Sequence, residues 1–372
     1  MSLAIETSTP QWFETIQPAY INGQPTYLDE NGELIEGIYT DLENDVYHSL
    51  DAFSSSLVKE LIKNTPAHVF RQYLSGIERK RTLSLTRTLD TGTLGHELIL
   101  EPNGFFNRYF RLPLAKEYEN ALSTATQLKA KCTELSLKTS GSKPELITRL
   151  TEHDPKILIF DVILEKLIIK HAGDKAFKLA QKQVELKNAS SIIRAFELPI
   201  VQKEALKKPI DGLVWDDAQR ILATFKKHRR APRFINNGYA ELTVIARCPV
   251  TGLMLKTKFD YINKQALASD VKTTRSTNPI KFALQCRDLR YDVQEAFYKY
   301  VANLAGVPVK IFGFISIEYA DADICEVFEI SKRRQMLAHA DMTKGLQVLA
   351  DCLDTNDWYG YSKHDEIMVI DF

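Results

Sequence analysis

A switch in hydrophobic period near residue 240 most constrains the fold of this 372-residue chain. Apolar and polar residues alternate there in successive short runs, which predicts β-strands, and helical periods return between and after them. The predicted elements, in order, are strands 241–247, 253–262 and 266–272, a helix 280–304, strands 310–319 and 324–330, and a helix 331–353. This order predicts a small α/β (α+β) core, in which a mixed sheet is flanked by helices.

The chain ahead of this core is predicted to be helical. Ser54 to Ser56 can cap a helix, and Pro66 can open the next one. The predicted helices that follow lie at 89–100, 125–135, 143–150, 155–186 and 216–227. Residues 1–36 contain two Asn-Gly turn dipeptides and no helical period, which predicts an extended arm.

The zero formal net charge of the chain is an average over regions of opposite charge. Residues 1–50 carry nine acidic and no basic side chains, whereas residues 121–240 carry 22 basic and 13 acidic ones. Neutrality of the whole chain is therefore no argument against a DNA partner.

Composition narrows the class of protein. No run of about 18 apolar residues is present to span a membrane, and the first residues lack the pattern of a secretory signal. The five cysteines are scattered without a CxxC pair, so we expect reduced thiols and a cytoplasmic protein.

Acidic residues and a lysine cluster on the predicted strands. Asp260 lies near the end of the second strand, and Asp270 and Lys272 share one face of the third, with Val271 between them. Converging carboxylates suit Mg²⁺, with Mn²⁺ as the other option, and Glu241 on the first strand is a third candidate. The alternative is an inert surface pattern on an edge strand.

The residues after Lys272 are of types that contact phosphate and DNA. Thr273 extends the strand, and Tyr291, Gln294 and Tyr298 share one face of the next helix. Two helix aromatics are more often core residues, but a glutamine between them is an unusual core choice. A basic run at the end of the predicted helix 216–227 is either a solvated helix end or a phosphate contact, and its candidates are Lys226, Lys227, Arg229 and Arg230.

Together these residues carry a family resemblance. Asp260, Asp270-Val271-Lys272 and Gln294-x-x-x-Tyr298 resemble the PD-(D/E)xK nuclease superfamily, and more narrowly the RecE-type exonucleases (exodeoxyribonuclease VIII). The stretches Tyr47–His68 and Gly92–Pro102 are also similar to that family. Phe259 stands where the superfamily has proline, and Lys258 stands where this branch usually has arginine.

The resemblance implies an activity and a site. It implies a Mg²⁺-dependent exonuclease that degrades one strand of duplex DNA from its 5′ end and leaves a 3′ single-stranded tail for recombination. Asp260, Asp270, the Val271 carbonyl and His96 would hold the metal, Lys272 would activate the water, and Gln294 and Tyr298 would contact the DNA. The implied setting is the cytoplasm of a bacterial or phage-infected cell, with a ring-shaped homo-oligomer, double-stranded DNA ends and a single-strand annealing protein as partners.

A second resemblance covers residues 122–150, which look like a SAP motif, a two-helix DNA-binding hairpin. Its polar link ends in Ser142 and Lys143, where backbone N–H groups at a helix start favour phosphate. The alternative is a plain helical hairpin that packs against the core.

The predicted organisation follows from both resemblances. It comprises an acidic N-terminal arm (1–36), the N-terminal helical part of the nuclease domain (37–120), a SAP-like insertion (121–154), a helical connection (155–204) and the catalytic PD-(D/E)xK core (205–372). Two other functions stay open at this point: a structure-specific or nicking endonuclease on the same core, and a non-catalytic DNA-binding scaffold.

Overall fold

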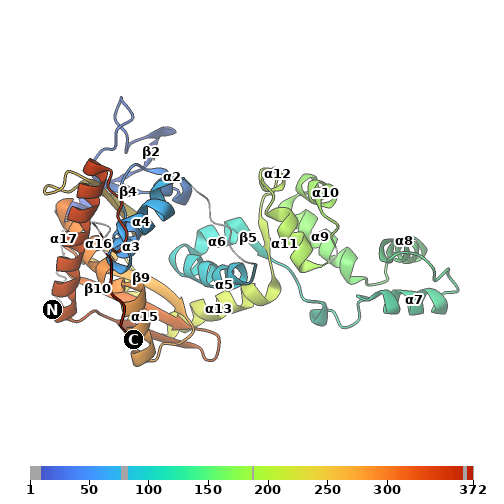
Figure 1. The fold of residues 1–372 in the computed structure, drawn as a ribbon. Coiled ribbons are helices and arrows are strands. Elements are labelled where there is room, and N and C mark those ends of the chain that lie inside the picture. The colour runs from blue at the N-terminus through green and yellow to red at the C-terminus, as the bar shows by residue number, and fades with distance from the viewer. Residues whose placement is uncertain (1–9, 77–82, 187, 363–366, 372) are drawn as a thin grey trace, which may run out of the picture. The chain divides into compact units, whose positions relative to one another are not determined.

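The computed structural model describes residues 10–76, 83–186, 188–362 and 367–371 (Figure 1). The chain divides into two compact units. The first comprises the residues up to Gly92 and from Arg220 onward, and the second comprises Thr93–Gln219. No helix within the described ranges is both long and apolar enough to cross a membrane.

A seven-stranded mixed sheet organises the first unit, in the order β1-β4-β7-β8-β9-β10-β11. β7, β8 and β9 form an antiparallel meander, and β10 lies parallel to β9. This arrangement confirms the predicted mixed sheet. The strands are β1 (Ile16–Pro18), β4 (Gly37–Thr40), β7 (Gly238–Arg247), β8 (Met254–Asn263), β9 (Leu267–Thr274), β10 (Ile311–Glu318) and β11 (Ile324–Phe328).

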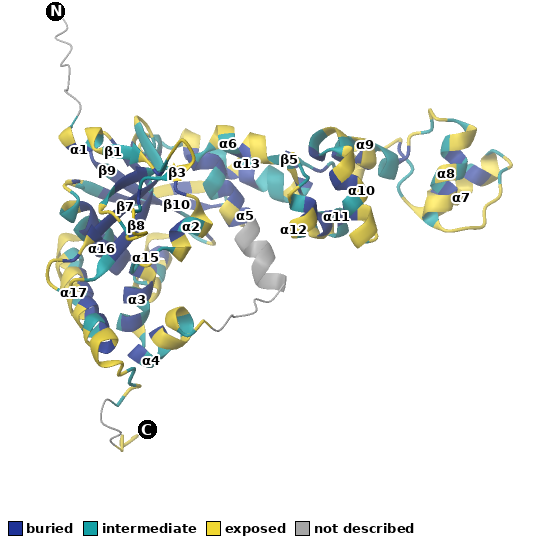
Figure 2. Ribbon diagram, turned by 90° about the horizontal axis from the view of Figure 1, so that it is seen from above, coloured by how far each residue is buried: buried dark blue, intermediate teal, exposed yellow. Residues whose placement is uncertain are grey.

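Helices pack on this sheet through a continuous apolar core. Phe259 and Phe312 of the sheet, Phe297 of α16 and Met342 of α17 are all fully buried in it. Figure 2 shows β7 and β8 in the dark blue of buried residues, while the outer faces of the helices are exposed. The helices of this unit are α1 (Gln11–Glu14), α2 (Asn44–Ser49), α3 (Ser55–Lys63), α4 (Pro66–Val69), a π-helix (Phe70–Leu74), α14 (Ala231–Phe234), α15 (Pro279–Leu289), α16 (Tyr291–Leu304) and α17 (Lys332–Thr355).

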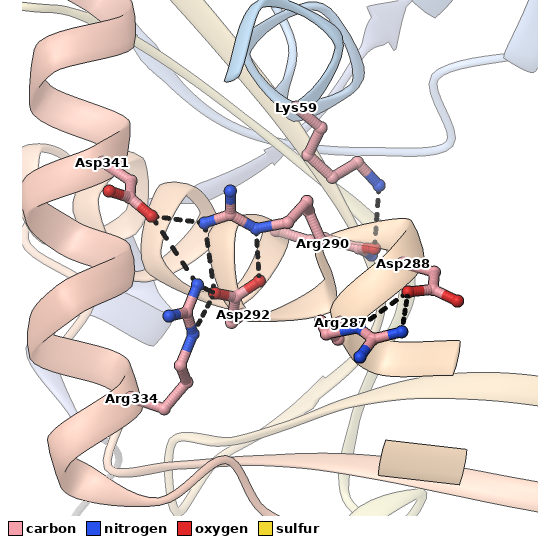
Figure 3. Close-up of polar contacts among 8 residues, drawn as sticks. Lys59, Arg287, Asp288, Arg290, Asp292, Arg334 and Asp341 are labelled. Atoms are coloured by element: carbon pink, nitrogen blue, oxygen red, sulfur yellow. Dashed lines mark hydrogen bonds and ion pairs between the residues drawn. The ribbon is translucent and has the colours of Figure 1, made fainter. Parts of the chain in front are cut away.

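The helix predicted over 280–304 is in fact two helices, because Arg290 adopts the left-handed conformation with φ 52°. Its guanidinium donates to Asp292 and Asp341, and Arg334 donates to Asp292 from α17 (Figure 3). Asp292 is buried, so these charge-assisted bonds stabilise the break. The break gives α16 a direction of its own across the sheet.

Residues 10–36, the described part of the extended arm that we predicted for residues 1–36, pack against the first unit, and residues 1–9 lie outside the described residues. Trp12, Ala19 and Tyr27 are buried in the cores of the first unit, and β1 pairs with β4. Two short strands, β2 (Tyr20–Ile21) and β3 (Gln24–Pro25), form a hairpin. Aromatic side chains without a regular period anchor this segment, which is why the sequence pattern did not reveal it.

The second unit is mainly helical. It contains the short parallel pair β5 (Tyr109–Arg111) and β6 (Lys208–Ile210). The helix predicted over 155–186 is broken at Gly173, whose φ is 94°. The helices are α6 (Pro102–Arg108), a 3₁₀ turn (Ala115–Glu117), α7 (Ala125–Glu134), α8 (Lys143–His153), α9 (Phe160–Ala172), α10 (Asp174–Gln183), α11 (Ala189–Phe196) and α12 (Pro199–Gln202), while α5 (Leu83–Leu100) and α13 (Gly212–Lys227) contain residues of both units.

The start of β7 offers a test of the β7–β8 pairing. A Cβ atom at Gly238 would lie 2.2 Å from the carbonyl oxygen of Ile262, which is a backbone atom and cannot turn aside. We expect Gly238→Ala to lower the free energy of unfolding by about 2 kcal/mol, as overpacking does. Gly360→Ala is the matched control, because a Cβ there meets nothing within 4 Å. Urea unfolding of both variants measures the effect, and equal stabilities would contradict it.

Candidate active site

Two carboxylates face each other across the central strands. The β7–β8 pairs on either side, Ala240 with Tyr261 and Leu242 with Phe259, place Glu241 opposite Asp260, and an oxygen of one carboxylate lies within 4.8 Å of an oxygen of the other. Like charges at this distance repel unless a cation lies between them. Hard oxygen donors of this kind fit a divalent metal ion such as Mg²⁺ or Mn²⁺.

Glu241 also has an unusual backbone. Its φ of 52° lies in the left-handed region, which is strained for a residue that carries a side chain. Strained backbone inside a regular strand persists only where the surrounding structure enforces it, and such positions cluster at functional sites. This geometry supports Glu241, the third candidate carboxylate, as part of the site.

Asp260 lies one residue beyond the end of the β8–β9 pairing, whose last pair on this side is Tyr261 with Ser269. Its Oδ2 accepts a hydrogen bond from the backbone N–H of Val271 at 2.7 Å, where the ladder between the strands has ended. The N–H and C=O groups of one strand residue point to the same side. The Val271 carbonyl therefore faces the same opening, and its role as a metal ligand stays a prediction.

Asp270 is held by two side chains that the sequence analysis also selected. It is 2% exposed, and it accepts from the Gln294 amide at 2.5 Å and pairs with the Lys272 ammonium at 2.5 Å. Gln294 therefore reaches β9 from α16, and its contact with DNA stays a prediction. The structure brings Asp260 next to Glu241 and engages Asp270 with Lys272 and Gln294.

The charge state of Lys272 follows from its neighbours. Burial acts to lower the pKa of Lys272, but the carboxylates of Asp270 and Asp260 outweigh it, and the pKa is raised above its usual value. The ammonium also lies 4.8 Å from the centre of the Tyr291 ring. Lys272 is therefore a cation at neutral pH.

Tyr291 is a correction to the predicted DNA contacts. Its ring is buried and stacks on Phe314 with 5.5 Å between centroids, and its hydroxyl accepts a hydrogen bond from Gln285. A buried ring beneath Lys272 supports that lysine and is not free to contact DNA.

Tyr298 lies one turn further along α16 than Gln294. Its ring packs edge-on against Phe259 and Phe312. Burial, with the nearby Tyr47 and Asp270, raises the pKa of Tyr298 well above its usual value. The hydroxyl stays protonated, so it can donate a hydrogen bond.

His96 lies on α5, in the second unit. It follows Gly92 by four residues, so the two share a face of the helix. A Cβ at Gly92 would lie 2.7 Å from Oγ1 of Thr273, which shows how closely the helix at Gly92 approaches β9. The metal-binding role of His96 and the DNA-binding role of Thr273 stay predictions.

Two lysines of the site were given no role in the sequence analysis, although Lys258 was noted there at a position where the family usually has arginine. Lys258 is 8% exposed, donates to the Leu42 carbonyl and to Asn44, and lies 3.9 Å from Glu241. The sequence could have identified Lys258 from its place in the β8 strand, because it comes two residues before Asp260 and so lies on the same face. Lys59 of α3 contacts Gln294 at 3.4 Å, and no local pattern marks it.

The basic run at the end of α13 is exposed. Lys226, Lys227, Arg229 and Arg230 are all accessible. The carbonyl of Arg233, just beyond them, accepts from Asn263 at the end of β8. The run is thus anchored to the strand that carries Asp260, and its contact with DNA stays a prediction.

The helical hairpin α7–α8 has its own small core, formed with residues such as Leu128, Leu146 and Ile159. The start of α8 differs from our expectation. The Glu145 carboxylate caps it by accepting from the N–H and hydroxyl of Ser142, and Lys143 pairs with Asp161 at 2.7 Å. The N–H of Ser142 is therefore not free, and a phosphate would have to displace these carboxylates.

Paired carboxylates on an antiparallel meander, an Asp-x-Lys strand and a glutamine from the next helix define a nuclease of the PD-(D/E)xK class. Residues 173–368 match the family model of a PDDEXK-like domain of unknown function, over more than half of the chain. The chain belongs to this family. Residues 122–155 match the SAP domain, which confirms the SAP motif predicted for the α7–α8 hairpin.

The chain has a distant likeness to two solved structures. Among solved structures, a presumed exonuclease from Eubacterium rectale is 8% identical, with a TM-score of 0.43 over 90% of this chain and 96% of that one. The protein SSO0001 is 9% identical, with a TM-score of 0.22 over 45% of this chain and 83% of that one. No curated protein matches the chain.

The strained backbone of Glu241 makes a prediction about stability. Glycine adopts positive φ without the steric cost that a Cβ brings, so we expect Glu241→Gly to be more stable than Glu241→Ala by about 1 kcal/mol. Elsewhere in a strand the order is the reverse, because glycine costs more conformational entropy. Chemical unfolding of both variants in EDTA measures the difference, and a more stable alanine variant would show that the backbone is unstrained.

Proposed function

We propose that this protein is a Mg²⁺-dependent double-strand DNA exonuclease. The observation that carries the proposal is the Glu241–Asp260 carboxylate pair beside the Asp270–Lys272–Gln294 group. Family membership supports a nuclease, and the SAP domain supports DNA as the substrate. Digestion from the 5′ end, to leave 3′ single-stranded tails for recombination, rests on the resemblance to RecE-type exonucleases.

The proposed roles follow the geometry. Asp260, Asp270 and Glu241 hold the ion, with the Val271 carbonyl and His96 as further ligands. A divalent ion supplies Lewis acidity toward the phosphate and the attacking water. Lys272 orients that water and offsets negative charge on the phosphate, because its raised pKa keeps it protonated at neutral pH.

Other residues would hold the DNA. In this proposal Tyr298 donates a hydrogen bond to the strand, and Gln294 keeps Asp270 in place while facing the same strand. The exposed basic side chains at the end of α13, together with the α7–α8 hairpin, bind duplex phosphates. The affinity for DNA therefore falls as the salt concentration rises. On the family resemblance alone, the protein forms a homo-oligomeric ring, works with a single-strand annealing protein and acts in the cytoplasm of a bacterial or phage-infected cell.

Activity on linear duplex DNA tests the proposal directly. We expect the wild-type protein to release acid-soluble nucleotides with Mg²⁺ and not with EDTA. Asp270→Ala and Lys272→Ala should each lose about 100-fold or more in rate, since each removes a group that acts on the reacting phosphate. Lys310→Ala, at a lysine just before β10 and outside the proposed site, serves as the control and should keep the wild-type rate.

Two outcomes would contradict this proposal. Full activity of Asp270→Ala or Lys272→Ala would show that the proposed active site is wrong. Cleavage of closed circular plasmid, which has no ends, would favour an endonuclease on the same fold over an exonuclease.

Metal binding can be tested without activity. A ligand that binds only the folded state raises the melting temperature. We expect Mg²⁺ or Mn²⁺ to raise the melting temperature of the wild-type protein, and Asp260→Asn and Glu241→Gln to abolish the rise. A rise that persists unchanged in both variants would place the ion elsewhere. Differential scanning fluorimetry across a metal titration gives the measurement.

A further inference from the structure

Lys59 reaches the reaction centre from a part of the chain far away in sequence. Its Nζ lies 3.4 Å from Oε1 of Gln294, and the same amide donates from Nε2 to Asp270 at 2.5 Å. Figure 3 shows Lys59 extending from its helix toward the segment that carries Arg290. One amide group thus separates the Lys59 ammonium from a carboxylate of the proposed metal site. The two contacts also fix which way the Gln294 amide points.

Packing sets the position of Lys59. The residue before it, Val58, is fully buried, and a Cβ at Gly345 of α17 would lie only 3.1 Å from its Cγ1. Leu57 and Leu61 are buried on the same helix. α3 therefore lies tightly against α17, and Lys59 projects from a rigid element rather than from a loop.

The ammonium of Lys59 has weaker partners than the other lysines around the site. Lys272 pairs with Asp270, Lys258 donates to a carbonyl and an amide, and Lys256 donates to three carbonyls. Lys59 has one long hydrogen bond to an amide oxygen, and no carboxylate of the described chain forms an ion pair with it. An ammonium carries three donors, so its capacity is largely unused.

The electrostatic surroundings of Lys59 also favour an anion next to its ammonium. Burial, with the positive charge of Lys272, lowers the pKa of Lys59 to about 8, and the nearby Asp270 opposes this shift. A partly buried cation next to another cation is stabilised by an anion placed between them. A phosphate bound at the site would supply that anion.

We propose that Lys59 binds a non-bridging phosphate oxygen of the DNA strand held at the site. The inference rests on the proposed function, since it assumes that the site holds DNA. A phosphodiester carries one negative charge and oxygen acceptors, which match a compact cation with free donors. Lys59 would thus be a substrate-contacting residue supplied by α3, outside the strands and helix that carry the other roles.

The test uses the slope of DNA affinity against salt, which reports how many phosphates are neutralised. In an Asp260→Asn protein, which we expect to bind DNA without cutting it, Lys59→Met should weaken duplex binding about tenfold at low salt. It should also reduce the slope of log K against log salt by about 0.9, the value for one phosphate contact. Lys59→Arg should keep the slope. Fluorescence anisotropy over a salt series gives both quantities.

Lys63 provides the matched control. It lies one turn along α3, is exposed, and has the same side chain. Lys63→Met should leave the slope unchanged, and thermal unfolding should show that both methionine variants fold. An unchanged slope in Lys59→Met, or an equal loss in Lys63→Met, would overturn the proposal. Because binding is measured without hydrolysis, failure of the wild-type protein to release nucleotides would refute the proposed function separately.

Discussion

The repulsion between Glu241 and Asp260 is the constraint on which the site depends. Two unit charges less than 5 Å apart in a protein of effective dielectric about 20 repel by about 3 kcal/mol. The fold keeps them there by the register of β7 and β8, at the cost of a left-handed backbone at Glu241. It offsets the charge with Lys258, 3.9 Å from Glu241, and with the Val271 N–H on Asp260. In the proposed function, a divalent cation between the two carboxylates would offset the rest of this repulsion.

The lysines on β8 show how this charge is built into the core. Lys256, Lys258 and Asp260 occupy every second position of β8, so they lie on the same face of the strand. This face points toward the α2 segment. Lys256 donates to the carbonyls of Tyr47 and Leu50, at the C-terminal end of α2, where the helix dipole favours a cation. Buried ammonium groups cost free energy unless such partners satisfy them. The N-terminal region and the β7–β9 meander therefore stabilise each other.

Sequence patterns predicted the regular part of the fold and missed its irregular points. The alternation of apolar and polar residues in the sequence located β7, β8 and β9 each to within three residues, although the structure buries long runs of each strand on both faces. The helix break at Arg290 was missed, since arginine has no preference for positive φ and the contacts that stabilise the break come from Arg334 and Asp341 on another helix, α17. The anchoring of Trp12 and Tyr27 was missed for the same reason, because their partners are distant in sequence.

By itself, the sequence determined the order of strands and helices, the Asp-x-Lys face of β9 and the shared helix face of Gln294 and Tyr298. These are properties of one element, and the period of a strand or helix sets them. Only the tertiary structure decided that Glu241 faces Asp260, that Tyr291 lies buried under Lys272, and that Lys59 meets Gln294. Register and packing between elements decide such contacts, and no local period records which side chains will meet.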